Sequence, residues 1–220
     1  MGQPGLEPIE TMDLPAGEAC LDFVNTGSRL IERHAGLEGE ALRAAGPFGD
    51  RLESYGDLVT FGERAGLIDA GLGRRLRARA AAEPGAAAAV LGAARELRES
   101  LYRLFAGVGD EGGARAADLE RVRDAAAAAA ARQRLVRTER GFELTWPEAA
   151  ELERLIWPLA TSAMALLVSG DMTRVKECAS HDCNWLFLDE SRNRSRRWCD
   201  MKVCGNRAKA RHYYHRHQGG

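Results

Sequence analysis

The sequence predicts a mainly α-helical fold with a small β-hairpin, in which a helical N-terminal domain, residues 1–170, precedes a small four-cysteine module, residues 171–220. Three observations lead to this prediction. Apolar residues recur at helical spacing through most of the segment 1–170. One stretch around position 140 alternates apolar and polar residues, as a strand does. Four of the five cysteines lie between positions 178 and 204.

The N-terminal segment is expected to begin irregularly and then to form one short buried element. Residues 1–15 contain Pro and Gly and are expected to have no regular structure. The stretch GEACLDFVNTGSRLIERH, residues 17–34, has its apolar residues close together. We expect it to form a short helix or strand that buries Leu21 and Val24.

Two helices are predicted next. RLESYGDLVTFGERAGLID has apolar residues at helical spacing, with Ser54 placed to cap the helix and Gly66 placed to end it. Residues 69–82 are rich in Arg and Ala and are predicted to be helical. The sequence EPG at 83–85 is expected to break that helix.

Two further helices follow, separated by a loop. Residues 86–106 place their apolar side chains on one face, which is typical of a helix that packs on a core. GVGDEGG, residues 107–113, is expected to be a loop. Residues 114–131 include seven consecutive alanines, 125–131, and are predicted to be helical because Ala has the strongest helix propensity.

A hairpin and one more helix complete the N-terminal domain. RQRLVRTERGFELTWP, residues 132–147, alternates on both sides of ERG and predicts a small hairpin. Pro147 is expected to open a helix at its first turn, and this helix should run to about Val168. SGD, residues 169–171, should end it.

The charge is unevenly distributed along the chain. The net formal charge is −1, but residues 1–170 carry 20 basic and 26 acidic side chains, whereas residues 171–220 carry 11 basic and 6 acidic ones. Such asymmetry indicates a polyanionic partner for the basic part. The alternative is a solvated basic tail.

The four clustered cysteines have the spacing of a metal site. Cys178 and Cys183 form one C-x4-C pair, Cys199 and Cys204 form a second, and the segment 184–198 separates the pairs. Two local pairs with an intervening loop suit a tetrahedral zinc site. Because four thiolates leave no position for water, the site should hold one structural Zn²⁺ rather than a catalytic one. The alternatives are reduced, partly buried thiols or two disulfides.

Histidines leave a second ligand set open. His181 lies inside the first cysteine pair, and His212, His215 and His217 lie near the C-terminus. A Cys3His site that uses one of them is the alternative to four cysteines. His181 is expected to be exposed. Four thiolates and one Zn²⁺ carry a net charge of −2, so nearby cations should stabilise the site; the candidates are Arg196, Arg197, Lys202 and Arg207.

The residues between and after the cysteine pairs predict an arm and a basic helix. NWLFLDESRNRSRRW, residues 184–198, is expected to form a hairpin-like arm between the two pairs. Gly205 and Asn206 suit a turn and an N-cap, and a helix should follow from Arg207 to about His217. This helix has no apolar stripe, so it cannot be buried on a core.

A polar helix beside alternating arginines indicates contact with nucleic acid, because Lys and Arg neutralise phosphate groups. DNA is favoured over RNA, since the sequence has no signature of a sheet with stacking aromatic residues. The candidate contact residues are Arg192, Arg194, Arg196, Arg197, Arg207, Lys209 and Arg211.

Two segments resemble known families. CASHDCNWLFLDESRNRSRRWCDMKVCGNRAKAR, which begins at Cys178, closely resembles the CGNR zinc finger family, named for the run Cys204, Gly205, Asn206 and Arg207. ACLDFVNT and LESYGDLVTFGERAGLI are similar to the ABATE domain that commonly precedes this finger. The resemblance covers nearly the whole chain. It implies a bacterial transcription regulator with a zinc-dependent DNA-binding finger.

Two other functional classes are alternatives. In a protein-interaction module without nucleic-acid binding, the zinc site would brace a surface anchored by Trp185, Phe187 and Trp198. An enzyme would use Asp22, Asn25 or Cys20, but no activating partner is visible in the sequence, so we predict no catalytic activity.

We interpret Asp22 and Asn25 as a buried hydrogen-bonded pair rather than as a ligand pocket, and Cys20 as a packed apolar residue. No run of eighteen apolar residues predicts a membrane span, and the N-terminus does not resemble a signal peptide, so a cytoplasmic location is expected. The sequence leaves open homo-oligomerisation, the inducing small-molecule or protein signal, the DNA sequence, and activation versus repression.

Overall fold

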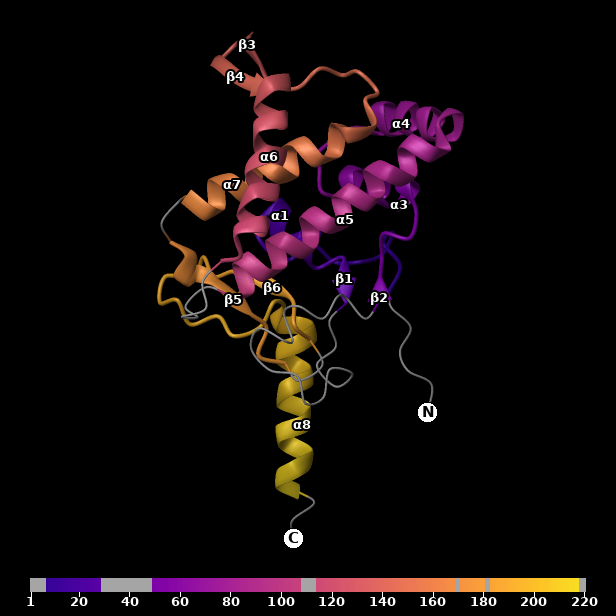
Figure 1. The fold of residues 1–220 in the computed structure, drawn as a ribbon. Helices are drawn as coiled ribbons and strands as arrows, with labels where there is room; N and C mark the ends of the chain where they lie inside the picture. Colours follow the sequence, from indigo (N-terminus) through magenta and orange to yellow (C-terminus); the bar gives the residue numbers. More distant parts are fainter. Residues whose placement is uncertain (1–6, 29–48, 108–113, 169–170, 181–182, 218–220) are drawn as a thin grey trace.

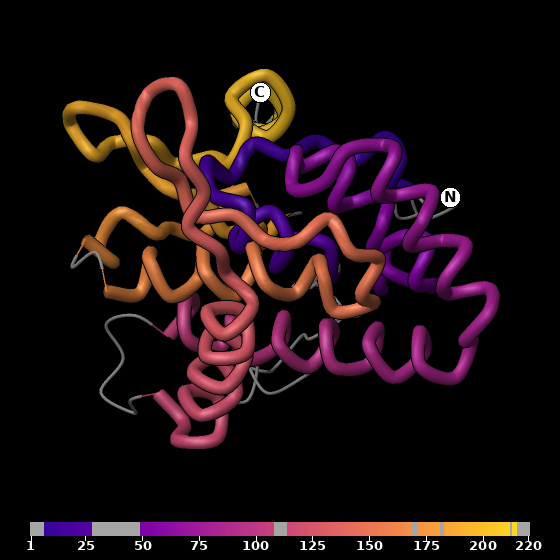
Figure 2. The backbone as a smooth tube through the Cα atoms, turned by 90° about the horizontal axis from the view of Figure 1, so that it is seen from above, coloured from indigo at the N-terminus to yellow at the C-terminus, as the bar shows by residue number. Residues whose placement is uncertain are grey.

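The computed structural model describes residues 7–28, 49–107, 114–168, 171–180 and 183–217. These residues form a mainly helical body with three separate two-stranded sheets, and the C-terminal helix projects from one end of it (Figure 1). Figure 2 shows the same body from above, with the C-terminal helix seen along its axis. The mainly helical fold with small hairpins is therefore confirmed. None of the helices in these ranges is long and apolar enough to span a membrane.

The short helix α1 (Ala19–Val24) lies at the centre of the helical body, where it packs against the longer helices. The other helices of the body are α3 (Tyr55–Arg64), α4 (Ala70–Ala82), α5 (Pro84–Ala106), α6 (Ala116–Arg132), the 3-10 turn η2 (Leu152–Leu155) and α7 (Ile156–Val168). The strands of the body are β1 (Gly27–Ser28), β2 (Gly49–Asp50), β3 (Arg134–Thr138) and β4 (Gly141–Thr145).

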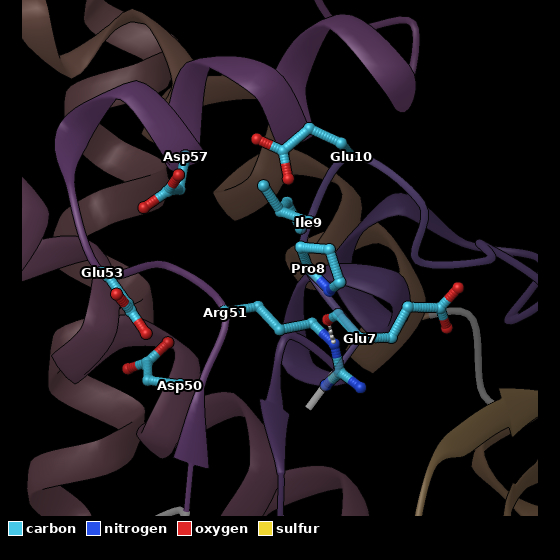
Figure 3. A pocket seen from close by; sticks show the side chains of 8 residues that line it. All are labelled: Glu7, Pro8, Ile9, Glu10, Asp50, Arg51, Glu53 and Asp57. Atoms are coloured by element: carbon cyan, nitrogen blue, oxygen red, sulfur yellow. Dashed lines mark hydrogen bonds between the residues drawn. The ribbon is translucent and has the colours of Figure 1, made fainter. Parts of the chain in front are cut away.

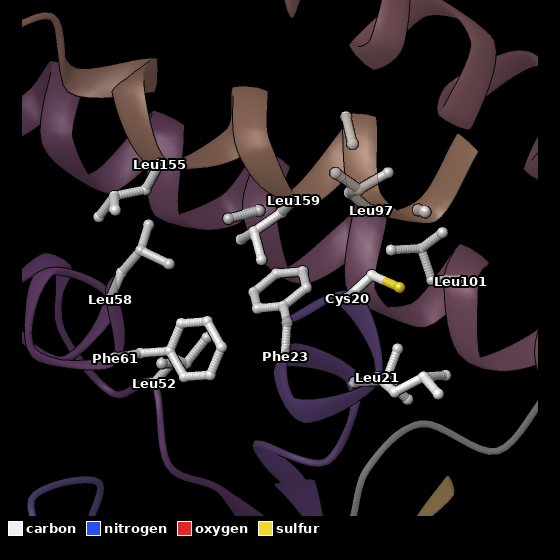
Figure 4. Close-up of a cluster of buried hydrophobic side chains, with 14 of the residues drawn as sticks. Cys20, Leu21, Phe23, Leu52, Leu58, Phe61, Leu97, Leu101, Leu155 and Leu159 are labelled. Carbon is white, nitrogen blue, oxygen red and sulfur yellow. The ribbon is translucent and has the colours of Figure 1, made fainter. Parts of the chain in front are cut away.

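The hydrophobic core forms around α1. Leu21 and Phe23 are fully buried, and the Phe23 ring lies 5.8 Å from the ring of Phe61 on α3 (Figure 4). Leu97 and Leu159 bring α5 and α7 to the same cluster. A helix as short as α1 is not stable alone in water, so it depends on this packing.

The ends of α3 agree with the prediction. The Ser54 hydroxyl accepts a hydrogen bond from the backbone N–H of Asp57, and the Asp57 carboxylate accepts one from the backbone N–H of Ser54. Gly66 follows the helix with a φ of +69°, a left-handed conformation that favours glycine. The predicted helix at 69–82 is also confirmed, as α4, which Asp69 caps.

Two helix starts differ from the prediction. Helix α5 begins at Pro84, two positions earlier than expected, because proline suits the first turn of a helix. The prediction that a helix begins at Pro147 was wrong, since regular structure begins only at Leu152. The preceding segment is held by distant residues: the Trp146 indole N–H donates to Ala129 of α6, and Arg75 donates to the carbonyl of Glu148.

The predicted hairpin at 132–147 is confirmed as the antiparallel pair β3–β4, with Leu135 opposite Leu144. Residues 7–15 contain no helix or strand, as expected. Residues 108–113 of the predicted loop, residues 169–170 of the predicted helix end, and residues 29–34 of the first predicted element lie outside the described residues.

The polar residues of ACLDFVNT do not pair with one another, so the predicted Asp22–Asn25 pair was wrong. The Asp22 carboxylate accepts a hydrogen bond from the backbone N–H of Ala16, at 3.0 Å. The Asn25 amide donates to the carbonyl of Leu186, at 2.9 Å, and accepts from the N–H of Leu186, at 2.8 Å. Both side chains are buried, and each fixes a different segment of backbone against α1.

Thr26, the last residue of the same motif, belongs to a buried ionic network. The Arg98 guanidinium is only 1% exposed and makes two parallel hydrogen bonds to the Asp50 carboxylate, at 2.6 and 2.7 Å. Arg98 also donates to the Thr26 hydroxyl, at 3.1 Å. Burial alone would raise the pKa of Asp50, but the hydrogen bonds and charge of Arg98 outweigh it and hold this pKa below its usual value.

Replacing Asn25 by alanine should destabilise the protein by about 3 kcal/mol, because it leaves the buried N–H and C=O of Leu186 without partners. The measurement is urea denaturation of the zinc-loaded variant followed by circular dichroism. Asn193→Ala is the matched control, since Asn193 is exposed and its replacement should change the free energy of unfolding by less than about 0.5 kcal/mol. Equal stability of the two variants would contradict the role given to Asn25.

Asp22 should make stability depend on pH. Burial raises the pKa of the Asp22 carboxyl to about 7. A raised folded-state pKa gives stability that is fully present below the unfolded pKa of about 3.9 and is lost as the pH rises through the folded value. We expect the stability of Asp22→Asn relative to the wild type to rise by about 2 to 3 kcal/mol between about pH 5 and pH 8. A difference that stays constant over this range would refute the shift.

Candidate metal centre and basic helix

The first cysteine pair occupies the turn of a hairpin. Strand β5 (Val175–Glu177) ends just before Cys178, and β6 (Leu186–Leu188) begins three positions after Cys183. The two strands pair antiparallel, and the N–H of Cys178 donates to the carbonyl of Trp185, at 2.9 Å. The hairpin expected between the two cysteine pairs was therefore misplaced: β6 pairs with the strand before Cys178, and no strand occurs among residues 189–198.

The second cysteine pair leads directly into the C-terminal helix. Cys204 lies in a π-helical turn, η4 (Met201–Gly205), that continues into α8 (Asn206–His217). The Asp200 carboxylate caps this turn by accepting a hydrogen bond from the N–H of Val203, at 2.8 Å. Gly205 and Asn206 are thus helical, and Asp200 is the N-cap that was expected at Asn206.

The four cysteine sulfurs form one cluster. The Sγ atoms of Cys178, Cys183, Cys199 and Cys204 lie within 4.8 Å of one another. Cys199 Sγ is 3.6 Å from Cys183 Sγ and 3.7 Å from Cys204 Sγ, and all four thiols are free of disulfides. Zn–S bonds of about 2.3 Å place the sulfurs of a tetrahedral site about 3.8 Å apart. The cluster therefore fits a zinc ion and defines a four-cysteine metal site.

The electrostatics of the cluster favour a bound cation. Hydrogen bonds from Cys183 and Cys199 lower the pKa of the Cys178 thiol, whereas the contact with Cys178 raises the pKa of Cys183 and of Cys199. One thiolate thus suppresses ionisation of its neighbours. The N–H of Cys199 also donates to Cys178 Sγ, at 3.4 Å. All four sulfurs can be thiolates together only when a metal ion compensates their charge.

A cation from the N-terminal part of the chain lies near the cluster. The guanidinium carbon of Arg51 lies 5.6 Å from the centre of the ring of Trp185, the second residue after Cys183. Burial lowers the pKa of Arg51, although the nearby Glu7 and Cys183 oppose this. This arginine follows β2 and is far from Trp185 and Cys183 in the sequence. It was not among the expected stabilising cations.

The histidines of the alternative Cys3His site fall outside the part of the chain that the structure describes. His181 and the side chains of His212, His215 and His217 lie outside the described residues. Within the described residues, the cysteines alone form a group with metal-ligand geometry.

Asp189 organises the turn that separates the two cysteine pairs. Its carboxylate is fully buried and accepts hydrogen bonds from Lys176 Nζ, at 2.5 Å, and from the backbone N–H groups of Ser191 and Arg196, both at 3.0 Å. Burial would raise its pKa, but the hydrogen bonds from Lys176 and Ser191 outweigh burial and hold the pKa well below the usual value. The turn includes Arg194, whose φ of +50° is left-handed.

Arg196 joins the module to the N-terminal segment. Its guanidinium donates to the carbonyls of Trp198, at 3.0 Å, of Cys199, and of Pro15, at 3.1 Å, and lies 4.5 Å from the centre of the Phe187 ring. A guanidinium held by several backbone carbonyls is committed to the fold. We therefore do not propose Arg196 as a phosphate contact.

The other candidate contact residues differ in their surroundings. Arg194 is exposed but bonds to Asp171, at 3.2 Å. Arg197 is exposed and stacks on Trp198. Arg211 is half-buried and donates to Ser180 on the first cysteine turn, at 3.3 Å. The remaining candidates are exposed: Arg192, Arg207 and Lys209.

Helix α8 projects away from the module and from the body of the protein, and it carries basic residues with it (Figure 1). Among its described side chains only Ala208 and Arg211 are partly buried, and both lie in its first half. The described side chains of α8 agree with the prediction that this helix has no apolar side to bury.

A pocket of about 190 Å³ lies beside β2 (Figure 3). It is lined mainly by carboxylates, and Arg51 crosses it to donate to the carbonyl of Glu7, at 2.9 Å. Two of its carboxylates are already engaged, Asp50 by Arg98 and Asp57 by the cap of α3. The other three carboxylates, those of Glu7, Glu10 and Glu53, belong to exposed residues.

The fold and the cysteine cluster define a helical protein that ends in a zinc-finger module. Comparison with protein families agrees. Residues 174–217 match the CGNR zinc finger, and residues 17–170 match the ABATE family, described as "Putative stress-induced transcription regulator". The chain belongs to the ABATE family and carries a C-terminal CGNR zinc finger. The description of the ABATE family thus names a transcription regulator. No curated protein matches the chain.

Replacing Cys199 by serine should abolish metal binding, because it removes the thiolate that neighbours two others in the cluster. Native mass spectrometry of protein purified under reducing conditions should show about one zinc ion per wild-type chain and none in the variant. Cys20→Ser is the control. Cys20 is buried on α1 and is not part of the cluster, so this variant should keep its zinc. Zinc retained in Cys199→Ser would contradict the four-cysteine site.

Proposed function

We propose that this protein is a zinc-dependent, DNA-binding transcription regulator. In this proposal residues 1–170 sense a signal or mediate association, and residues 171–220 contact DNA. One structural Zn²⁺, held by Cys178, Cys183, Cys199 and Cys204, fixes the module. Four thiolates fill the tetrahedron, so the ion supplies stability rather than a reactive water.

The observation that carries the proposal is the anchoring of a basic helix without an apolar stripe to the cysteine cluster. Cys204 lies in the turn that becomes α8, and Arg211 ties the helix to Ser180 on the other cysteine turn. A helix without an apolar stripe gains little from packing on its own protein. A rigidly held cationic helix instead complements a phosphate backbone, where each Lys or Arg releases condensed counterions.

The charge distribution supports the same orientation. Residues 171–220 carry an excess of five positive charges, and residues 1–170 an excess of six negative charges. A polyanion attracts residues 171–220 and repels residues 1–170, so the chain would approach DNA with α8 in front. The phosphate contacts we propose are Arg192, Arg197, Lys202 and Arg207, all of which are exposed.

The protein-interaction alternative has less support. Its proposed anchors face the protein itself: Phe187 is fully buried, and Trp185 and Trp198 pack against the core. Phe187 is therefore not available to a partner, and Trp185 and Trp198 are each half-buried.

Binding of the zinc-loaded protein to duplex DNA should weaken steeply with salt. Four phosphate contacts predict a slope of about −3 to −4 for the logarithm of the association constant against the logarithm of salt concentration. Fluorescence anisotropy with a labelled duplex measures this slope. The double variant Arg197→Ala/Lys202→Ala should reduce its magnitude by about 2.

The matched control removes the same charge elsewhere. Arg134→Ala/Arg137→Ala changes two exposed arginines of β3, in the hairpin at the end of the body opposite α8, and should leave the slope unchanged (Figure 1). A flat salt dependence for the wild type, or equal effects of the two double variants, would refute DNA binding through the module.

A further inference from the structure

The two sides of α8 differ in their surroundings. Ala208 and Arg211 are partly buried and face the module, and Arg211 is bonded to Ser180. With about 3.6 residues per turn, the opposite side of the helix carries Asn206, Lys209, Ala210 and Tyr213. All four of these residues are exposed. The module thus contacts one side of α8, and the opposite side, called here the outward face, is exposed.

The residue types of this outward face suit contact with base edges. A lysine can donate to guanine O6 and N7, and an asparagine can pair with adenine N6 and N7. Ala210 lies between Asn206 and Tyr213 on the helical surface and has a side chain of one methyl group. A small residue on this face lets the helix approach bases closely, and its methyl group suits the thymine methyl.

The neighbouring cations are not part of this face. Arg207 is about 100° around the helix from Asn206, and Lys202 and Arg197 lie before α8 begins. The major groove of B-DNA is about 12 Å wide and admits one α-helix, with phosphates on both rims. A helix inserted with its outward face leading would place these flanking cations near the phosphates.

We infer that α8 is a recognition helix that enters the major groove of duplex DNA, where Asn206, Lys209, Ala210 and Tyr213 determine the sequence specificity. This inference rests on the proposed DNA-binding function. It separates residues that read bases from residues, such as Lys202, that only position the module on the backbone.

The first test compares two single lysine variants that change the net charge equally. Zinc-loaded wild-type protein is used to select duplexes from a library with a random central segment, and the selected site is compared with an unrelated duplex. Lys209→Ala should change the preferred base at one or two adjacent positions and weaken binding to the selected site by about 5- to 100-fold. Lys202→Ala, the control, should weaken binding to both duplexes equally and keep the selected sequence.

The second test adds bulk to the outward face without changing charge. Ala210→Leu should reduce affinity for the selected site at least about 10-fold, while zinc content, helicity and the salt dependence of binding to the unrelated duplex stay unchanged. Ala130→Leu is the control, because Ala130 is also an exposed helical alanine but lies on α6. It should bind like the wild type.

The outcomes separate the inference from the function on which it rests. The inference is overturned if binding is steeply salt-dependent but no sequence is enriched, or if Lys209→Ala and Ala210→Leu bind the selected site as the wild type does. In both cases DNA binding through the module stands. Absence of any salt-dependent binding overturns the inference and the proposed function together.

Discussion

The mutual repulsion of four sulfurs, balanced by a metal ion, is the constraint on which the C-terminal structure depends. Four thiols within 4.8 Å of one another cannot all ionise unless a cation lies among them. A cation among the sulfurs would join three segments that follow one another between Cys178 and Cys204: a hairpin turn, a loop and the start of a helix. The free energy of zinc binding, on the order of 10 kcal/mol, thereby becomes folding energy for a segment with little core of its own.

The segment that carries the four cysteines is also part of the core of the helical body. Asn25 pairs with the backbone of Leu186, the N–H of Leu188 donates to the carbonyl of Ala16, and Arg196 reaches the carbonyl of Pro15. Leu186 and Phe187 are buried against α1 and its neighbours. The zinc finger is therefore fixed on the helical body by hydrogen bonds and by apolar packing. Because α8 continues from the finger, these contacts also determine its direction relative to the body.

How far the sequence predicts this structure depends on how far apart the interacting residues are. The cap at Ser54 and the end at Gly66 follow from neighbours within a few positions, and two C-x4-C pairs mark the metal cluster for the same reason. Asn25 bonds to a residue 161 positions away and Arg196 to one 181 positions away. No local pattern distinguishes such an asparagine from one that pairs nearby, or such an arginine from one that is free to bind phosphate.

The same long-range contacts determine how loss of the metal would propagate. Without the ion, repulsion between the thiolates or protonation of the thiols would release Cys183, which lies three positions before the start of β6. Strand β6 supplies both partners of Asn25 and the buried ring of Phe187, so its displacement removes contacts from α1 itself. Since α1 is too short to persist without its packing, the helical body loses stability together with the finger. We therefore expect the metal-free protein to be destabilised in the core around α1, and not only in its C-terminal module.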